Sequence, residues 1–285
     1  MKLKLAVIGS PIKHSLSPFI HKTALEKAGF FCEYEVCEVT EDNLFEFLNY
    51  AKENNFNGFN ITMPLKQSII KYLDEIDGDA LLCGAVNTVK IKNGKLFGFN
   101  TDGEGYKKSL EDKDFFLKDK NVAFIGAGGS ALAVSMKAAK ENAAEITVIN
   151  RSEKRSRELC DFIFEKTGFS AVAETFEAEN LKRISKKADL LINATPLGMS
   201  GVAADYEDLS FLNYLKKDAL VSDFIYNPCE TKFLGTAKSL GLKSLNGLGM
   251  LIYQGLISDS IYLEKDLDFK NIKNHIETEY KKIIV

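Results

Sequence analysis

The sequence predicts an α/β protein of two domains. Strand and helix patterns alternate along almost the whole of the 285-residue chain, which is typical of parallel sheets covered by helices. A charged stretch, EDKDFFLKDK, is followed by a second strand–helix–strand series that contains the glycine-rich segment FIGAGGSALA. We therefore place the first domain at residues 1–105 and the second at residues 106–247.

The strands of the first domain are expected to form a mostly parallel sheet with one antiparallel pair. Apolar strand patterns cover residues 3–8, 34–39 and 59–62. Asn93-Gly94 is a strong hairpin signal, and it joins two further strands at residues 86–92 and 95–100.

The helices of this domain are indicated by their start signals and by their apolar spacing. Ser17-Pro18 offers a cap residue and a proline at the first helical position, and Gly29 should end that helix. Further helices are expected after Pro64 and from about Asp102. Residues 41–54 predict an amphipathic helix, and its inward side chains should be Leu44, Phe45, Leu48 and Ala51.

The second domain repeats the strand–helix alternation. Strands are expected at residues 122–125, 146–149, 190–194 and 219–224. Helices are expected at residues 130–141 and 153–166. The tail, residues 248–285, predicts two helices with no strand between them.

Composition narrows the functional class. Hydrophobic residues make up 45% and charged residues 27%, the net charge is -3 and no run of like charges occurs, so nucleic acid and membrane surfaces are not expected partners. The apolar part of MKLKLAVIGS is too short for a signal peptide, and no later stretch reaches the length of a membrane span. Five scattered cysteines predict reduced thiols and no metal site. We expect a cytoplasmic protein.

The glycine-rich turn predicts a dinucleotide site. Gly126, Gly128 and Gly129 lie where a strand ends and a helix begins, so backbone amides and the helix N-terminus can face a pyrophosphate. Ala131 or Ala133 occupies the place of the usual third glycine, and either is small enough for close helix–strand packing.

The end of the next strand predicts which dinucleotide is bound. A carboxylate is expected there in a protein that binds NAD, but this chain has Asn150 and Arg151 instead. The planar guanidinium of Arg151 can bind a 2′-phosphate and stack on adenine. Lys154 or Arg155 would add a second positive charge, so NADP is the expected cofactor.

Four polar segments of the first domain follow strand ends, namely SPIKHSLSP, GFNITMPLK, GAVNTV and GFNTDGEG. Because ligands bind at the carboxyl ends of parallel strands, these segments can converge on one site. Hydroxyl and amide groups of this kind suit a small, polyhydroxylated, anionic ligand. The candidate side chains are Ser15, Ser17, Asn60, Thr62, Lys66, Asn87, Thr101 and Asp102.

In combination, these motifs resemble the shikimate dehydrogenase family over nearly the whole chain. Matching segments include SLSP, GFNITMPLK, GAVNT, GFNTDGEG, GAGGSALA, NRSEKR, NATPLGM, IYNP and NGLGMLIYQG. The resemblance implies an N-terminal substrate domain, a Rossmann NADP-binding domain and a tail, residues 248–285, that completes the first domain. It also implies reversible NADPH-dependent reduction of 3-dehydroshikimate to shikimate, a step of chorismate and aromatic amino acid biosynthesis.

The resemblance also assigns site residues. The implied catalytic pair is Lys66 and Asp102. The implied substrate-binding residues are Ser15, Ser17, Asn60, Thr62, Asn87, Tyr226 and Gln254. The implied cofactor-binding residues are Gly126, Ala127, Gly128, Gly129, Ser130, Ala131, Asn150, Arg151, Ser152, Lys154, Arg155, Thr195, Gly247 and Met250.

Reduction of a ketone needs a proton for the developing alkoxide. Histidine is the usual donor, but His21 and His275 fall in helices and are interpreted as structural, which leaves His14 as a weak alternative. Lys66 is the better candidate, and we expect it to form an ion pair with Asp102. The sequence leaves open whether Lys66 donates the proton or mainly positions the substrate and stabilises charge.

Three other functions were weighed against this one. An NAD-preferring quinate/shikimate dehydrogenase shares the fold, but Arg151 and its basic neighbours argue against it. A methylenetetrahydrofolate dehydrogenase would not explain the SLSP and GFNTD segments. A catalytically silent metabolite sensor would not need both Lys66 and Asp102. The chain is expected to be a monomer or a homodimer.

Overall fold

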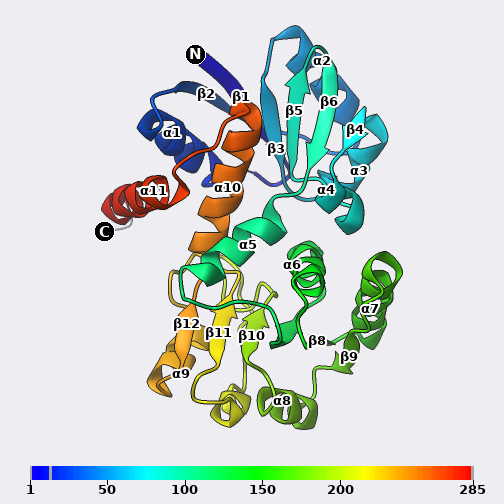
Figure 1. Cartoon of the computed structure of the whole chain (residues 1–285), viewed down its shortest axis with the longest axis vertical. Helices are drawn as coiled ribbons and strands as arrows, with labels where there is room; N and C mark the ends of the chain where they lie inside the picture. Colours follow the sequence, from blue (N-terminus) through cyan, green and yellow to red (C-terminus); the bar gives the residue numbers. More distant parts are fainter. Residues whose placement is uncertain (1, 13–14, 284–285) are drawn as a thin grey trace. The chain divides into compact units, whose positions relative to one another are not determined.

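The computed structural model describes residues 2–12 and 15–283. The chain divides into two compact units (Figure 1). The first comprises Met1–Gly105 together with Ile252–Val285, and the second comprises Tyr106–Leu251. Among the helices of the described residues, none combines the length and the hydropathy of a membrane span.

The first unit contains one six-stranded sheet in the order β2-β1-β3-β5-β6-β4. Its strands are β1 (Lys2–Gly9), β2 (Phe31–Glu38), β3 (Gly58–Ile61), β4 (Glu75–Ile76), β5 (Thr88–Lys92) and β6 (Lys95–Phe99). Its helices are α1 (Ser17–Lys27), α2 (Leu44–Glu53), α3 (Leu65–Ser68), the 3₁₀ turn η1 (Ile70–Tyr72), α4 (Gly78–Cys83) and α11 (Phe269–Ile283). Helices α5 (Asp102–Glu111) and α10 (Leu248–Leu263) begin in one unit and end in the other.

Strand pairing in this sheet differs from the prediction of one antiparallel pair. β1 pairs in parallel with β2 and β3, and β4 pairs in parallel with β6. β5 is antiparallel to both of its neighbours, β3 and β6, so there are two antiparallel pairs. The hairpin was predicted correctly, but the hairpin signal says nothing about the direction in which its first strand meets the rest of the sheet.

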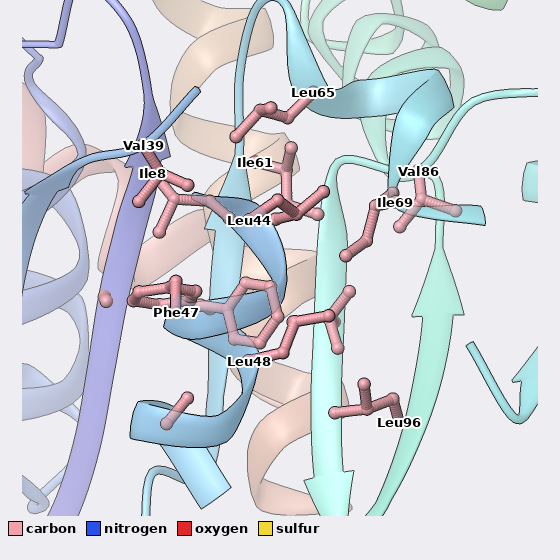
Figure 2. Close-up of a cluster of buried hydrophobic side chains, with 14 of the residues drawn as sticks. Ile8, Val39, Leu44, Phe47, Leu48, Ile61, Leu65, Ile69, Val86 and Leu96 are labelled. Atoms are coloured by element: carbon pink, nitrogen blue, oxygen red, sulfur yellow. The ribbon is translucent and has the colours of Figure 1, made fainter. Parts of the chain in front are cut away.

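The central strand β1 shows how the sheet is covered on both faces. Leu3, Leu5 and Val7 pack with Leu25 of α1 and Tyr262 of α10. The alternating residues of β1 point to the opposite face, because successive side chains of a strand alternate. There, Ala6 and Ile8 join a second apolar cluster that includes Leu44, Phe47 and Leu48 of α2 (Figure 2).

Helix α2 corrects one predicted core residue. Phe45 was expected to point inward, but 57% of it is exposed, whereas Phe47 is only 7% exposed. The buried residues of α2 are Leu44, Phe47, Leu48 and Ala51. This i, i+3, i+4, i+7 spacing keeps one face of the helix on the sheet, and Phe45 lies off that face.

The second unit contains a fully parallel six-stranded sheet in the order β12-β11-β10-β7-β8-β9. Its strands are β7 (Asn121–Ile125), β8 (Glu145–Asn150), β9 (Val172–Thr175), β10 (Leu190–Asn193), β11 (Leu220–Asp223) and β12 (Lys243–Leu245). Its helices are α6 (Gly129–Lys140), α7 (Glu153–Thr167), α8 (Ala178–Ser185), the 3₁₀ turn η2 (Ser210–Tyr214) and α9 (Lys232–Ser239). Taken in chain order, this is the 3-2-1-4-5-6 arrangement of a Rossmann sheet, which confirms the predicted fold class.

Short elements of the second unit were not predicted. β9, β12 and α8 have four, three and eight residues, and few of their side chains are fully buried. Segments this short offer little pattern in the sequence, although β9 and β12 complete the two edges of the sheet.

We predict that Phe47→Ala lowers the free energy of unfolding of the first unit by about 3–5 kcal/mol, because it opens a cavity beside Phe59 and Phe56. Phe45→Ala removes the same side chain from the same helix but at an exposed position, so its effect should stay within about 0.5 kcal/mol. Urea unfolding followed by circular dichroism compares the two variants. Equal losses would show that the buried face of α2 is wrongly assigned.

Candidate active site

Lys66 and Asp102 form an ion pair in the first unit, as the sequence predicted. Lys66 lies on the short helix α3 after β3, and Asp102 is the first residue of α5 after β6. The Lys66 Nζ lies 2.6 Å from the Asp102 Oδ2. Only 10% of the Asp102 side chain is exposed, against 23% for Lys66, so the ammonium is the more accessible partner.

The amide of Asn87 holds the second oxygen of Asp102. Its Nδ2 donates to the Asp102 Oδ1 at 2.8 Å and also lies 2.9 Å from the Thr101 Oγ1. Its Oδ1 accepts from the backbone N–H of Thr101 at 2.9 Å. With both carboxylate oxygens occupied, the plane of Asp102 is fixed, and so is the direction from which Lys66 approaches it.

A buried chain of amides and hydroxyls extends from Asn87 into the unit. Thr88 Oγ1 lies 3.0 Å from the Asn87 Oδ1 and 2.7 Å from the Ser258 Oγ of α10. The Asn60 Nδ2 in turn lies 3.2 Å from the Ser258 Oγ. The Asn87 Nδ2 also lies 3.5 Å from the Gln254 Oε1, one helical turn before Ser258. The predicted residues Asn60, Asn87 and Gln254 therefore belong to one network.

The two predicted serines lie at the start of α1. The Ser15 Oγ accepts from the backbone N–H of Ser17 at 3.2 Å, and both serines are half-buried. Ser17 was expected to cap this helix, but Leu16 occupies the N-cap position and no side chain caps it. Thr62 is half-buried directly after β3. His14, the alternative proton donor, lies outside the described residues.

The predicted residues that belong to the second unit surround the carboxyl ends of β7, β8, β10 and β11. Gly126 and Ala127 follow β7, Gly128 is the N-cap of α6, and Gly129 begins the helix. Gly126 has φ +112°, and a Cβ there would lie 2.8 Å from the Ala194 carbonyl oxygen. The turn can therefore pass against the end of β10 only because residue 126 is glycine.

The start of α6 presents backbone groups to solvent. Gly128 and Gly129 are exposed, no side chain caps the helix, and a Cβ at either position would meet nothing within 4 Å. Ser130 is half-buried beside them. Ala131 and Ala133 are buried, in keeping with the expected close packing of helix on sheet. Uncapped N–H groups at a helix N-terminus are a favourable site for a phosphate.

A basic corner follows β8, at residues 150–155. Asn150 closes the strand and donates from Nδ2 to the Ser152 carbonyl at 3.2 Å. Arg151, Lys154 and Arg155 are exposed. Lys154 faces Glu158 at 3.8 Å, whereas within the described residues Arg151 and Arg155 have no acidic ion-pair partner. Two guanidinium groups without an acidic partner among those residues therefore follow β8, the strand that pairs with β7: Arg151 directly after the strand and Arg155 in the first turn of α7.

A buried aspartate, Asp223, supports the loop after β10 through Asn193. Thr195 donates from Oγ1 to the Asn193 Oδ1 at 2.6 Å, and the Asn193 Nδ2 donates to the Asp223 Oδ1 at 3.1 Å. Asp223, which is fully buried, also accepts from the backbone N–H of Ile225 and from the Thr231 hydroxyl. Burial raises the pKa of Asp223 to about 6, although these three donors oppose the rise.

The remaining predicted residues lie farther along the chain. Tyr226 is half-buried after β11, and burial raises its pKa. Gly247 donates its backbone N–H to the Ile225 carbonyl at 3.0 Å, and Met250 is buried in the first turn of α10. Tyr226, Gly247 and Met250 belong to the second unit, whereas the other predicted substrate-binding residues belong to the first.

Sequence reasoning missed the supporting residues of both sites. Thr88 and Ser258 are ordinary hydroxyl residues in apolar elements, and nothing local marks them as partners of Asn60. Asp223 carries a usable signal, because an aspartate at the end of the apolar strand LVSD is unusual and its burial requires several donors.

A Rossmann sheet with a glycine turn, in a chain whose other unit holds a lysine–aspartate pair, defines a dinucleotide-dependent oxidoreductase. A family model described as the shikimate dehydrogenase substrate binding domain matches residues 7–89. A second, described as shikimate / quinate 5-dehydrogenase, matches residues 109–200. The chain belongs to the shikimate dehydrogenase family.

Individual relatives agree with the family models. A shikimate dehydrogenase (NADP(+)) of Methanococcus maripaludis is 44% identical over 266 residues, which cover 92% of each chain. A solved shikimate dehydrogenase in complex with NADP+ has a TM-score of 0.87 at 39% identity, covering 98% of this chain and 96% of that one. The shikimate 5-dehydrogenase of Listeria monocytogenes, solved with shikimate and NAD, has a TM-score of 0.88 at 33% identity and 96% coverage of both chains.

Asp223 predicts a pH dependence of stability. Because its folded pKa of about 6 exceeds its ordinary value of 3.8, it favours folding below pH 3.8 and loses that contribution as the pH rises through 6. Between pH 4 and pH 7 the wild type should lose about 2.4 kcal/mol relative to Asp223→Asn, which cannot ionise. Urea unfolding of both proteins at several pH values measures the difference. A difference that does not change with pH would contradict the prediction.

Proposed function

We propose that this protein is a shikimate dehydrogenase, which reversibly reduces 3-dehydroshikimate to shikimate with NADPH in the biosynthesis of chorismate and the aromatic amino acids. The observation that carries the proposal is the Lys66–Asp102 ion pair, anchored by Asn87, in a chain of this family. This ion pair lies among neutral amide and hydroxyl groups. We expect the protein to act in the cytoplasm, as a monomer or a homodimer.

The second unit has the features that NADP(H) requires. The open turn at Gly128 and the uncapped start of α6 suit the pyrophosphate, and Arg151 and Arg155 suit the 2′-phosphate. Asn193 holds Thr195 in place by a hydrogen bond. Thr195 lies within contact distance of Gly126, so its loop lies against the same glycine turn. When bound, NADP(H) supplies the hydride donor and acceptor of the reaction.

Lys66 is proposed to supply the proton and the positive charge that the reacting oxygen of the substrate needs. Its ammonium has three donors, and Asp102 uses one of them, so a substrate oxygen beside Lys66 can accept another. The positive charge opposes the negative charge that develops on that oxygen during reduction. Asp102 orients the ammonium and, being fixed by Asn87, does so in one direction.

The neutral side chains are proposed to bind the substrate. Ser15 and Ser17 at the start of α1 are proposed to bind its carboxylate, and Thr62, Asn60 and Gln254 its ring hydroxyls. Asn60 bonds Ser258 and Gln254 bonds Asn87, so these two amides are held in place before a ligand arrives. Tyr226, a residue of the second unit, is proposed as a further substrate-binding residue.

A quinate/shikimate dehydrogenase that prefers NAD is the second candidate, because the family model itself spans both substrates. The absence of an acid at residues 150–152 favours NADP. Oxidation of shikimate and of quinate with each dinucleotide, followed at 340 nm, separates these candidates. Shikimate with NADP should be the fastest combination, and no turnover with any of them would favour a metabolite sensor.

We predict that Arg151→Ala raises the KM for NADP about tenfold or more, because it removes charge-assisted hydrogen bonds to the 2′-phosphate. The KM for NAD should hardly change, since NAD lacks that phosphate. Arg157→Ala is the matched control, because Arg157 is an exposed arginine of the adjoining helix that already pairs with Glu153. An equal loss with both dinucleotides would show that Arg151 does not bind the 2′-phosphate.

We predict that Lys66→Ala lowers kcat about 10²- to 10⁴-fold, the range expected for a positioned acid–base group. The KM for NADP should stay within about twofold, since the cofactor groups lie in the other unit. Lys66→Arg keeps a charge but no readily transferred proton, so it should restore little activity.

Lys71→Ala, a change at an exposed lysine five residues later, controls for the loss of positive charge. Steady-state kinetics of shikimate oxidation measure all three variants. If Lys66→Ala keeps a near-normal kcat and loses only affinity for shikimate, Lys66 is a binding residue and the proton comes from another group.

A further inference from the structure

The first unit buries a histidine–aspartate pair that the reaction does not use. His21 lies on α1 and Asp259 on α10, and the His21 Nδ1 lies 2.6 Å from the Asp259 Oδ1. Their side chains are 1% and 0% exposed. Burying such a pair is costly and is weak evidence for a stabilising role, so its presence calls for another explanation.

Both polar groups have unused hydrogen-bonding capacity. In the described part of the chain, neither the His21 Nε2 nor the Asp259 Oδ2 has a hydrogen-bond partner. Burial raises the pKa of Asp259, and His21 opposes that rise. Whichever group carries the shared proton, the one short bond between them fixes the plane of the imidazole ring.

The fixed ring lies against a tyrosine. His21 stacks on Tyr34 of β2, with ring centroids 4.9 Å apart and planes inclined by 15°. A second tyrosine, Tyr262 of α10, lies 6.4 Å from the same imidazole at a steeper angle of 49°. Helix α10 passes close to α1 at Gly255, where a Cβ would lie only 3.1 Å from the Ile20 Cγ2 and 3.6 Å from the His21 Nε2.

The hydroxyl of Tyr34 connects this cluster to the substrate-binding groups. It donates to the Asn60 Oδ1 at 2.8 Å, which is shorter than either bond of the Asn60 Nδ2, at 3.2 Å to Ser258 and 3.4 Å to Thr88. A phenolic O–H directed at Oδ1 decides which way round the Asn60 amide lies. The hydroxyl of Tyr262, by contrast, is buried without a hydrogen-bond partner among the described residues.

We propose that Asp259, His21 and Tyr34 form a positioning unit for the substrate: Asp259 fixes the His21 ring, the ring fixes Tyr34, and the Tyr34 hydroxyl orients the amide of Asn60. The inference rests on the proposed function, because it assigns these three residues an effect on shikimate binding through Asn60. None of the three is itself a catalytic residue. Asn60 contacts the ring hydroxyls equally in the ground and transition states, so the effect falls on KM rather than on kcat.

Tyr34→Phe tests the last link and has a close control. It removes one hydroxyl and leaves Asn60 Oδ1 without its donor, so the KM for shikimate should rise about 5- to 30-fold, while kcat changes less than about threefold. Tyr262→Phe removes a buried hydroxyl from the other ring beside His21 and should leave both constants near their wild-type values. The KM for NADP should be unchanged in both variants.

Two substitutions of Asp259 test the first link. Asp259→Asn keeps an oxygen that can accept from His21 and should retain a KM within about threefold of wild type. Asp259→Ala releases the ring and should raise the KM for shikimate nearly as far as Tyr34→Phe does. Because both changes act through Asn60, the double variant Asp259→Ala/Tyr34→Phe should be no worse than the poorer single variant.

The possible outcomes separate the inference from the proposed function. If wild type oxidises shikimate and Tyr34→Phe behaves like Tyr262→Phe, the positioning unit does not exist. The same conclusion follows if Asp259→Ala and Asp259→Asn raise KM equally, or if the two effects multiply in the double variant. If the wild type itself fails to oxidise shikimate with either dinucleotide, the proposed function is wrong, whatever the variants do.

Discussion

The carboxylate of Asp102 is almost completely removed from water, and the organisation of the first unit depends on satisfying it. An unpaired buried carboxylate is too costly to keep, so Lys66 supplies the opposite charge and Asn87 supplies a hydrogen bond to the other oxygen. Asn87 is itself buried and needs partners for its carbonyl, which Thr101 and Thr88 provide. One charged group at the start of α5 thus requires a polar network that reaches β3, β5 and α10.

Asp223, a buried aspartate of the second unit, has different partners from those of Asp102. Asp223 has three hydrogen-bond donors but no cation as a salt-bridge partner within the described residues, and its pKa rises accordingly. Asp223 has a structural role, because its hydrogen bonds connect the loop after β10 to the loop after β11. The ionic partner of Asp102 is what distinguishes the proposed proton-transfer site from Asp223, which supports a loop.

The sequence predicts those parts of fold and site that are encoded locally. The glycine turn, the basic corner and the polar strand ends each lie within about ten residues, and the ends of neighbouring strands meet by geometry alone. Strand geometry places Lys66 and Asp102 at the same edge of the sheet, and the family resemblance singles them out as a pair. The direction of β5 and one inward residue of α2, Phe47 in place of Phe45, were missed because they depend on packing between elements that are distant in the sequence.

The residues behind the site could not be predicted for the same reason. His21 was interpreted as structural from its place in a helix, and only the approach of α10 reveals that it meets Asp259 and Tyr34. Ser258 follows Gln254 by four residues, so the face of α10 that carries this proposed substrate residue also carries Ser258, whereas Asp259 points to a different side of the helix. A mostly apolar helix therefore supplies several members of the buried polar network.

Hydrogen bonds among the residues of the site determine how well it can discriminate one ligand from another. Asn60 and Asn87 already bond protein groups, so a ligand hydroxyl exchanges one hydrogen bond for another and gains little energy from each. A ligand that offers the wrong pattern, however, leaves a buried donor or acceptor unpaired, which is strongly unfavourable. Selectivity in such a site comes from the fixed orientation of each amide rather than from the number of contacts. The groups that hold those amides in place are therefore as important to specificity as the groups that touch the ligand.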